Sequence, residues 1–447
     1  MNNSIIHWKK CKFEFRDMKR LILQQLCKWK DSSERKPLIL NGARQVGKTY
    51  ILNEFGKAYY KNVAYINLDK DKQAASIWEK DFDVNRIILS LSALLNVSIK
   101  PEDTLIILDE IQDCPKALSS LKYFCEDAPE YHVVVAGSLL GLSLHEGVSF
   151  PVGKVDMLRL YPMTFREFLM ANGEERLADL LIGDDMELID VLGEKYKYLL
   201  RQYYYTGGMP AVVKEYVESH DLQKVRDIQK QILFDYRRDF SKHAPANQVP
   251  RINMVWDSIP SQLAKENRKF IYGAIKKGSR ASEFEIAIQW LIDAGLVYKI
   301  PRVTAARMPL KFYEEQTVFK LFVLDVGLMG AMVDIPARDV LVNDNAIVEY
   351  KGSFTELYAL TQIVTMGVPV YYYSSNDSIV EIDFIVQGNE RVIPIEVKAE
   401  VNVKAKALRQ FVTDNPDLRG LRLSMLGFQE QNWMENKPLY APDTWLK

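Results

Sequence analysis

The sequence predicts an α/β protein whose N-terminal part is built on an open, parallel sheet. Short apolar runs alternate with helical stretches through the first third of the chain, as they do in strand–helix–strand units. Glycine-rich or polar residues follow directly after three of these runs, and in a parallel sheet the carboxyl ends of the strands form the edge where ligands bind. Toward the C-terminus, a helical stretch followed by strands in hairpin spacing predicts a second α/β segment.

The composition is that of an ordinary soluble globular protein. The chain has 447 residues, of which 48% are hydrophobic and 26% are charged, and this length predicts two to four domains. A net charge of −1 gives no overall attraction to nucleic acid or membrane, so any basic surface must be local. The four cysteines form no C-x-x-C pair, and the start of the chain has no apolar core of a signal peptide. We therefore expect a cytoplasmic protein with no membrane segment and no disulfide framework.

The first elements in the chain lead to a phosphate-binding loop. Residues 16–30 have the spacing of an amphipathic helix, and the apolar run 38–40 predicts a buried strand. The next eight residues match G-x-x-x-x-G-K-[ST], in which Gly42 and Gly47 let backbone N–H groups turn toward a phosphate. The alternative is an ordinary glycine-bearing turn between a strand and a helix. The predicted nucleotide site consists of Gly42, Ala43, Arg44, Gln45, Val46, Gly47, Lys48 and Thr49.

Side chains on this loop and after the following strands have the chemistry of a nucleotide hydrolase. Lys48 is expected to reach the β- and γ-phosphates, and the Thr49 hydroxyl to bind Mg²⁺. Asp109 ends an apolar run and is the expected metal-side carboxylate, with Glu110 beside it to activate water and Ser138 as a sensor of the γ-phosphate. The alternative for the acidic pair is a solvated loop or a helix N-terminus. The strands concerned are predicted over 63–69, 104–111 and 132–138.

The sequence gives less information about the base of the bound nucleotide and about the arginine finger. No Asn-Lys-x-Asp motif for guanine is present, so ATP is favoured over GTP. Spacing alone assigns no arginine finger, and each candidate is also consistent with an ordinary surface or ion-pair residue. These candidates are Arg44, Arg159, Arg166, Arg237 and Arg238.

The middle of the chain is predicted to be mostly helical. Thr164 is expected to cap a helix, with Glu167 three residues later as in a capping box. A glycine-proline break at 203–210 and a proline-bearing linker at 243–250 divide the helices that follow. Helices over 253–300 and strand material at 311–313 and 318–324 then suggest a winged helix.

This winged-helix segment is locally basic. Between positions 265 and 311 there are ten Lys or Arg residues against four acidic ones. A nucleic-acid-binding face and a solvated helical surface both fit this excess. The basic residues are at 265, 268, 269, 276, 277, 280, 299, 302, 307 and 311.

The C-terminal segment carries a second group of candidate residues. A helix is predicted over 345–366, a strand over 368–374, and a hairpin from 378–386 and 391–398. Residues two apart on a strand share a face, so Glu396 and Lys398 point the same way, and Asp383 lies on the partner strand. Two carboxylates and a lysine on one face can hold a divalent metal and polarise water for phosphodiester cleavage. The alternative is the charged, solvated face of a hairpin.

Together these motifs resemble those of one family, the prokaryotic AAA+-type ATPases that carry a C-terminal domain of unknown function. The resemblance covers nearly the whole chain. It implies an AAA+ (STAND-like) ATPase core, a winged-helix segment and a C-terminal fold similar to PD-(D/E)XK nucleases, which have a restriction-endonuclease-like α/β fold. The matching segments are 42–49, 108–112, 136–138, 161–169, 207–210, 381–384 and 395–398.

The resemblance also implies roles and domain limits. Lys48 and Thr49 would be the Walker A pair, Asp109 and Glu110 the Walker B pair, and the Gly-x-Pro element at 208–210 would lie near the nucleotide. In the nuclease-like domain, the residues that match the active site are Glu356, Asp383, Glu396 and Lys398. The domains would be an ATPase domain (1–205), a helical lid and linker (206–250), a winged-helix-like domain (251–335) and the nuclease-like domain (336–447).

Two hypotheses follow from the sequence. In the first, a Mg²⁺-dependent ATPase controls a C-terminal nuclease-like domain that binds DNA and a second divalent ion. Its catalytic residues would be Lys48, Glu110, Ser138 and Lys398, and its metal ligands Thr49, Asp109, Glu356, Asp383 and Glu396. In the second, ATP operates a signalling or scaffold switch, and the C-terminal domain is an inactive binding module. A protein partner or self-association is expected under either hypothesis.

Overall fold

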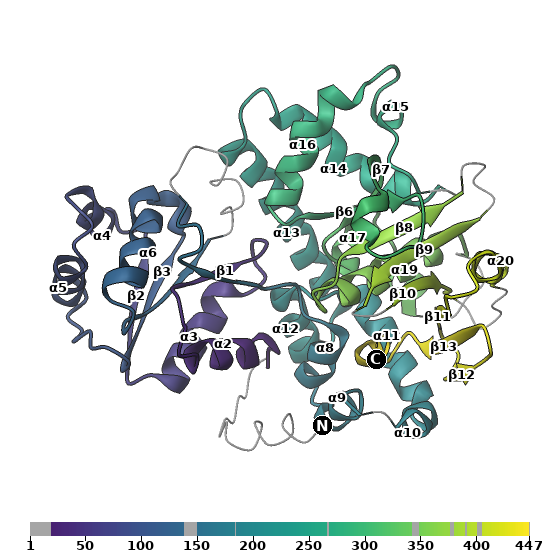
Figure 1. Cartoon of the computed structure of the whole chain (residues 1–447), viewed down its shortest axis with the longest axis horizontal. Coiled ribbons are helices and arrows are strands. Elements are labelled where there is room, and N and C mark those ends of the chain that lie inside the picture. Colours follow the sequence, from purple (N-terminus) through teal and green to yellow (C-terminus); the bar gives the residue numbers. More distant parts are fainter. Residues whose placement is uncertain are drawn as a thin grey trace. The chain divides into compact units, whose positions relative to one another are not determined.

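The computed structural model describes residues 19–137, 150–183, 185–265, 268–341, 348–375, 380–388, 391–399 and 405–446 (Figure 1). By its internal contacts the chain divides into two compact units, one up to Leu160 and the other from Tyr161 onward. The predicted limit at 205 stays a prediction. Among the described residues, no helix is long and apolar enough to cross a membrane.

The first unit contains the predicted parallel sheet. Its five strands lie in the order β2-β3-β4-β1-β5, and all neighbouring pairs are parallel. The strands are β1 (Leu38–Asn41), β2 (Asn62–Asn67), β3 (Thr104–Asp109), β4 (His132–Ala136) and β5 (Asp156–Arg159). Because these strands are parallel, the loop after β1 and the acidic end of β3 lie at the same edge of the sheet, and β4 lies between them.

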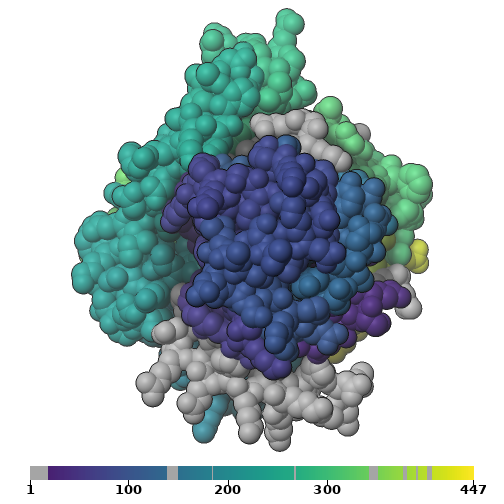
Figure 2. All heavy atoms as spheres, turned by 90° about the vertical axis from the view of Figure 1, so that its left-hand side faces the viewer, coloured from purple at the N-terminus to yellow at the C-terminus, as the bar shows by residue number. Residues whose placement is uncertain are grey.

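Helices cover both faces of this sheet. The helices are α2 (Ile22–Lys30), α3 (Lys48–Tyr59), α4 (Lys72–Ser76), α5 (Val84–Leu95) and α6 (Pro115–Asp127), with short 3-10 turns at Ile77–Glu79 and Ile111–Asp113. One face packs Ile106 and Val133 against α5 and α6. The other face meets α3, where a Cβ at Gly56 would lie 3.3 Å from Leu105. Figure 2 shows one face of this unit as a closely packed surface coloured purple to blue.

The second unit begins with helices. The predicted capping box is confirmed, since Thr164 accepts a hydrogen bond from the Glu167 N–H and the Glu167 side chain accepts one from the Thr164 N–H. The helices up to the first strand are α8 (Phe165–Ala171), α9 (Glu175–Leu180), α10 (Met186–Val191), α11 (Gly193–Thr206), α12 (Pro210–Ser219), α13 (Leu222–His243), α14 (Val249–Leu263), α15 (Tyr272–Ile275) and α16 (Ala281–Asp293).

A mixed eight-stranded sheet follows, in the order β12-β13-β11-β10-β9-β8-β6-β7. The strands are β6 (Val297–Val303), β7 (Glu314–Val323), β8 (Val370–Ser374), β9 (Glu381–Gln387), β10 (Val392–Val397), β11 (Gly420–Ser424), β12 (Gln429–Glu430) and β13 (Met434–Pro438). The remaining helices are α17 (Val326–Met332), α18 (Ala337–Leu341), α19 (Val348–Val364) and α20 (Lys406–Asp414). The predicted C-terminal helix and hairpin are thus confirmed within the described residues, with β9 and β10 antiparallel.

The segment predicted as a winged helix has the expected order of elements but a different environment. The antiparallel pair β6–β7 follows α14 to α16. Strand β6 also pairs in parallel with β8, so this hairpin belongs to the same sheet as the C-terminal strands. The strand expected at 311–313 was wrong, because Leu310–Tyr313 is a 3-10 turn in which Leu310 is fully buried.

The two faces of the large sheet have different contacts. Helix α20 packs Leu408 and Phe411 with Ile382 and Tyr371 in an apolar cluster on one face. The opposite face carries the buried aromatic pair Phe322–Phe384 as well as charged side chains. On it, Lys320 of β7 is fully buried and its Nζ lies 2.6 Å from a carboxylate oxygen of Glu381 on β9. Burial of a lysine requires such a partner.

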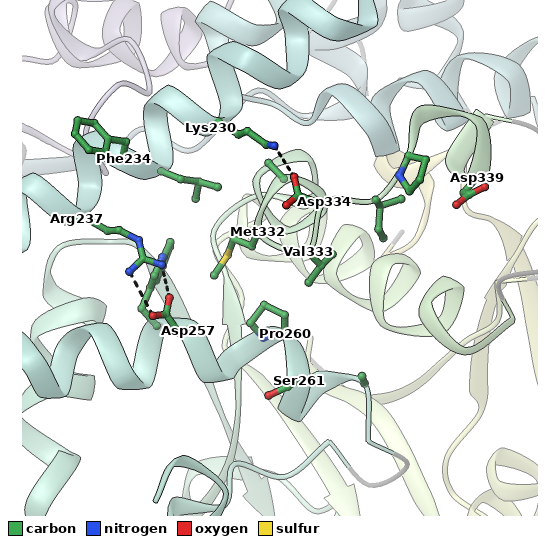
Figure 3. Close-up of a pocket in the computed structure, with 16 residues that line it drawn as sticks. Lys230, Phe234, Arg237, Asp257, Pro260, Ser261, Met332, Val333, Asp334 and Asp339 are labelled. Atoms are coloured by element: carbon green, nitrogen blue, oxygen red, sulfur yellow. Dashed lines mark hydrogen bonds and ion pairs between the residues drawn. The ribbon is translucent and has the colours of Figure 1, made fainter.

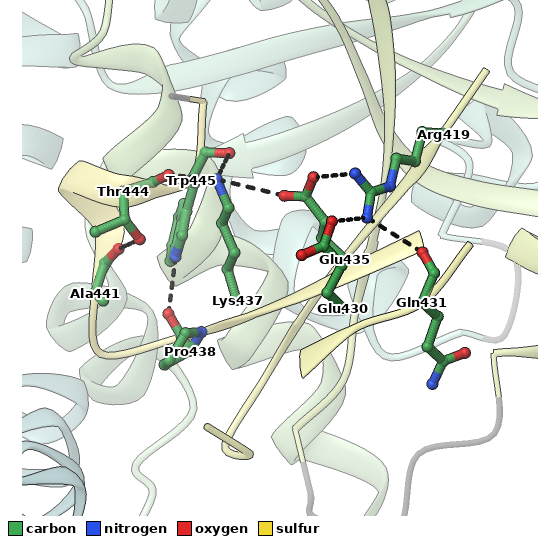
Figure 4. Close-up of polar contacts among 9 residues, drawn as sticks. All are labelled: Arg419, Glu430, Gln431, Glu435, Lys437, Pro438, Ala441, Thr444 and Trp445. Atoms are coloured by element: carbon green, nitrogen blue, oxygen red, sulfur yellow. Dashed lines mark hydrogen bonds and ion pairs between the residues drawn. The ribbon is translucent and has the colours of Figure 1, made fainter. Parts of the chain in front are cut away.

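Side-chain contacts secure the last strands of the sheet (Figure 4). The Arg419 guanidinium lies 2.8 Å from Glu430 and 2.9 Å from Glu435, which joins the start of β11 to β12 and β13. The Lys437 ammonium donates to the carbonyl of Thr444 at 2.7 Å, at the 3-10 turn Pro442–Thr444. The short edge strand β12 is therefore held by charge as well as by the backbone.

A glycine pair joins α11 to α8 and α17 within the second unit. The Gly208 carbonyl accepts the Met163 N–H at 2.6 Å, and the Gly208 N–H donates to a carboxylate oxygen of Asp325 at 2.6 Å. The other oxygen of Asp325 accepts the Leu328 N–H at 2.9 Å. Burial raises the pKa of Asp325 to about 6, against the effect of these N–H donors. A Cβ at Gly208 would lie 2.1 Å from the Met163 carbonyl oxygen, so this position has no room for a side chain.

We expect Gly208→Ala to lower the free energy of unfolding of the second unit by at least about 2 kcal/mol, because backbone must move to admit the methyl group. The measurement is the thermal unfolding midpoint of the full chain. Gly273→Ala is the matched control, since a Cβ at Gly273 meets no atom within 4 Å. Equal midpoints for the two variants would contradict the close contact between Gly208 and Met163.

Candidate functional sites

The phosphate-binding loop lies between β1 and α3, as predicted. Gly47 precedes the helix with a φ of 94°, a left-handed conformation that favours glycine. A Cβ at Gly42 would lie 2.3 Å from the Leu160 carbonyl oxygen, so the loop passes directly against the chain after β5. The two glycines of the motif are therefore required by backbone conformation and by close contact, respectively.

Lys48 is buried inside this loop. Its Nζ donates to the carbonyl oxygens of Gly42 and Ala43, each at 2.8 Å. Burial lowers the pKa of Lys48 to about 8, an effect that Glu110 and Asp109 oppose. Phosphate groups would supply the opposite charge that this buried ammonium lacks within its loop.

Asp109 connects several elements of the site through hydrogen bonds. It is 3% exposed, and its Oδ2 accepts hydrogen bonds from the hydroxyls of Thr49 at 2.8 Å and Tyr65 at 2.9 Å. The structure thus joins the predicted Walker A and Walker B residues across the end of β4. A threonine hydroxyl and a carboxylate are oxygen donors that fit Mg²⁺, and the ion would neutralise the phosphate oxygens there.

Glu110, the expected water-activating residue, is held in a left-handed conformation with a φ of 52°. Its carboxylate accepts a hydrogen bond from the Gln112 side-chain amide at 2.8 Å. Its own N–H donates to Asp109 at 3.1 Å. The backbone turn after β3 therefore separates the two carboxylates, leaving Asp109 against Thr49 and Glu110 against Gln112.

Two residues of this site had no signal in the sequence. The buried guanidinium of Arg20 donates to the Val46 carbonyl at 2.9 Å and so holds the loop from the N-terminal side. Tyr65 lies on β2 and reaches Asp109 because Asn67 pairs with Asp109 at the end of the two strands. Only the strand register brings Tyr65 to the site, and local patterns do not contain that information.

Other predicted residues are placed only in part. Ser138 lies outside the described residues, although β4 ends at Ala136 beside β1 and β3. Of the arginine-finger candidates, Arg166 lies 3.1 Å from Asp443 and Arg237 pairs with Asp257, so each has a carboxylate partner within the second unit. The finger stays unassigned.

The Arg237–Asp257 pair lines a cavity of about 880 Å³ in the second unit (Figure 3). Helices α13 and α14 and the α17–α18 connection form its walls. Lys230 and Asp334 make a second pair there at 2.6 Å. The charges within these two pairs neutralise one another, and Asp339 adds one more acidic side chain to the lining.

Three of the C-terminal candidate residues lie on β9, near the end of β10 and directly after it. The register shifts so that two residues of β9, Asp383 and Phe384, stand opposite Tyr372 of β8, which is a β-bulge. Asp383 accepts the Val397 N–H at 2.8 Å. The bulge thus turns Asp383 toward β10, where Glu396 lies.

Glu396 and Lys398 share a face, as predicted. The Lys398 Nζ lies 2.7 Å from Glu396 Oε1. Burial raises the pKa of Glu396, while Lys398 opposes the shift and Asp383 adds to it. Glu396 is 4% exposed, so this carboxylate is almost wholly removed from water.

Glu356 of α19 joins the cluster through Arg268, which the sequence analysis placed only among the basic residues of the 265–311 segment. The guanidinium of Arg268 forms an ion pair with Glu356 and lies 3.7 Å from an oxygen of Asp383. Among the described residues, no three His, Cys, Asp or Glu side chains are arranged to hold a metal ion. The predicted carboxylates are therefore neighbours, but they surround a guanidinium and a lysine instead of forming a three-ligand metal site.

Part of the basic segment 265–311 is also neutralised within the unit. Lys311 lies 2.6 Å from Glu314, Arg302 pairs with Glu315, and the Lys299 ammonium lies 4.5 Å from the Phe319 ring centre. With Arg268, four of the ten basic residues contact acidic or aromatic groups of the same unit. The local excess of charge is therefore smaller in the structure than in the sequence.

Comparison with protein families finds a domain match around the first site. Residues 34–169 match the family described as AAA domain. Residues 197–339 and 351–432 match two families described as domains of unknown function (DUF8612 and DUF4143). A comparison with curated proteins returned no match. The chain therefore contains a P-loop ATPase domain of the AAA type, and that domain includes the Thr49–Asp109 contact.

Solved structures show only distant likeness. The Walker-type ATPase of Pyrococcus abyssi has 13% identity and a TM-score of 0.46, with 72% of this chain and 99% of that chain covered. Cdc6p from Pyrobaculum aerophilum has 14% identity and a TM-score of 0.24, covering 71% and 93%. The Thermotoga maritima RuvB Holliday junction branch migration motor has 14% identity and a TM-score of 0.29, covering 64% and 90%. These scores are below the level at which two folds are taken as the same.

We expect Tyr65→Phe to raise the Mg²⁺ concentration needed for half-maximal ATP hydrolysis by about tenfold or more, because outer-shell partners of ligands have effects of this size. ATP binding without Mg²⁺, measured by calorimetry, should change little. Tyr198→Phe is the control, since Tyr198 is 60% exposed in the second unit. An unchanged Mg²⁺ requirement in Tyr65→Phe would show that its hydrogen bond to Asp109 has no part in metal binding.

Proposed function

We propose that the protein hydrolyses MgATP at the P-loop and that its nucleotide state controls a nuclease-like, DNA-handling segment at the C-terminus. The supporting observation for hydrolysis is the 2.8 Å hydrogen bond between Thr49 and Asp109. Thr49 and Asp109 are the two expected Mg²⁺ ligands, and the charges of Glu110 and Asp109 act on the buried Lys48, which supports the proposal. Lys48 would bind the β- and γ-phosphates, and Glu110 would orient and deprotonate the attacking water.

Lys48→Ala should lose ATP binding, because it removes the only ammonium buried in the loop. Glu110→Gln should bind ATP as the wild type does and hydrolyse it at least about a hundredfold more slowly, since general-base catalysis contributes on that scale. Binding is measured by calorimetry and turnover by phosphate release. Glu102→Gln, on an exposed turn before β3, serves as the control for a lost carboxylate. Hydrolysis retained in both variants would exclude this site as the ATPase centre.

The nuclease-like proposal is supported by the order of elements as well as by the four residues. The order along the chain is helix α19, strands β8, β9 and β10, helix α20 and strand β11. In the sheet these four strands are neighbours in the same order; β9 is antiparallel to both β8 and β10, and β11 is parallel to β10. This α-β-β-β-α-β order supports the proposal of a nuclease-like fold. Lys398 would polarise the attacking water, and Glu356, Asp383 and Glu396 would hold a divalent ion once the cations in the cluster permit it.

With Mn²⁺ and linear duplex DNA, we expect cleavage whose rate differs between the ATP-bound and ADP-bound protein. Lys398→Ala should reduce this rate at least about a hundredfold, because it removes the group that polarises water. Lys406→Ala is the matched control, since Lys406 is an exposed lysine at the start of α20. Cleavage that persists in Lys398→Ala comes from a contaminant.

One observation favours the second candidate function, an ATP-operated switch with an inactive C-terminal binding module. Two cations, Arg268 and Lys398, already pair with the carboxylates of the cluster. Salt-dependent DNA binding without cleavage in either nucleotide state would support this alternative. The proposed domain limits at 205, 250 and 335, a protein partner and self-association belong to both proposals.

A further inference from the structure

Arg268 lies between α14 and α15, far in sequence from the carboxylates that it contacts. Its guanidinium pairs with Glu356 of α19, whose side chain is only 3% exposed, and it lies near Asp383 of β9. The side chain of Arg268 is itself 20% exposed. A cation thus reaches a nearly buried cluster from a separate segment of the same unit.

The backbone of Arg268 has a left-handed conformation, with a φ of 47°. For a residue with a side chain this conformation costs about 1–2 kcal/mol. A strained position persists only where its surroundings stabilise it. The ion pair with Glu356 is the contact that offsets this cost.

Helix α19 leaves room for the guanidinium. Gly352 lies inside this helix, where glycine costs about 1 kcal/mol relative to alanine. A Cβ at Gly352 would lie 2.9 Å from Arg268 Nη2, which is closer than such atoms approach one another. The helix therefore has its smallest residue where the arginine passes.

In each glutamate of the cluster, only one carboxylate oxygen has a cationic partner. Oε1 of Glu356 pairs with Arg268, and Oε1 of Glu396 pairs with Lys398. Oε2 of each glutamate is buried without a hydrogen-bond partner. An unpaired buried group of this kind costs about 1–3 kcal/mol, and more for a charged one, so both oxygens are available to a further cation.

We propose that Arg268 is an internal cation lock: its guanidinium takes the place of a divalent ion among Glu356, Asp383 and Glu396, and the ion binds only after Arg268 withdraws. This proposal rests on the proposed nuclease-like function of the cluster. Metal and the Arg268 guanidinium compete for the same carboxylates. A ligand that shifts the position of the 268–270 segment therefore changes the metal affinity, and metal binding changes the affinity for that ligand by the same factor.

The test is Mn²⁺ binding to the full chain, measured by calorimetry and by electron paramagnetic resonance of free Mn²⁺. Arg268→Ala should gain one Mn²⁺ site at least tenfold tighter than any Asp383-dependent site of the wild type. The double variant Arg268→Ala/Asp383→Asn should lose this gain. Lys269→Ala, which removes the neighbouring cation, should bind Mn²⁺ as the wild type does.

A second variant covers the case in which Arg268→Ala does not fold. Gly352→Ala keeps every charge but places a methyl group against the guanidinium, and it should also gain the Asp383-dependent Mn²⁺ site. Its folding is checked by the thermal unfolding midpoint.

Two outcomes would overturn the cation lock. One of them leaves the proposed nuclease-like function standing, and the other overturns that function as well. If wild type and Arg268→Ala share an equally tight, Asp383-dependent site, Arg268 does not block metal, and the nuclease-like proposal stands. If neither the wild type, Arg268→Ala nor Gly352→Ala has an Asp383-dependent site, the carboxylates bind no metal, and the lock and the metal-dependent function fail together.

Discussion

The cost of burying a carboxylate is the constraint on which both sites depend. Asp109, Glu356 and Glu396 are 3%, 2% and 4% exposed, so each must find donors inside the protein. At Asp109 the donors are two hydroxyls and a backbone N–H, all of them neutral. These hydrogen bonds satisfy the oxygens without cancelling the negative charge. The nucleotide site therefore keeps an ordered anion that can meet a metal ion.

The C-terminal cluster meets the same constraint by different means. Glu356 and Glu396 are paired with fixed cations, Arg268 and Lys398, and each keeps one oxygen without a partner. A guanidinium competes with a metal ion for the same oxygens, whereas a hydroxyl can share them. Truncating one member of a buried ion pair leaves the other charge uncompensated, which is costly. The cations therefore hold the cluster together and at the same time set how readily it accepts a metal.

The parts that the sequence predicted are those encoded locally. The loop at 42–49, the capping box of Thr164 and Glu167, and the β9–β10 hairpin each depend on residues close together in the chain. The pairing of β6 with β8 joins residues about seventy positions apart, and no local pattern separates a wing from a strand of a larger sheet. Tyr65 and Arg268 were missed for the same reason, since only strand register and tertiary packing bring them to their carboxylates.

Energetics indicate why such a cluster would need more than metal to change state. A divalent ion at a hundred times its dissociation constant stabilises the bound form by about 2.7 kcal/mol. Changing a 99:1 ratio of closed to open forms into 1:99 takes about 5.5 kcal/mol, so metal alone would supply about half of that free energy. The strain at Arg268 and the unpaired oxygens of Glu356 and Glu396 raise the free energy of the closed form, in which Arg268 occupies the cluster. They therefore reduce the free-energy difference between this form and the open form, from which Arg268 has withdrawn. A firmly closed lock would still need a second ligand that distinguishes the two forms, and nucleotide and DNA are the ligands for which this chain carries candidate binding residues.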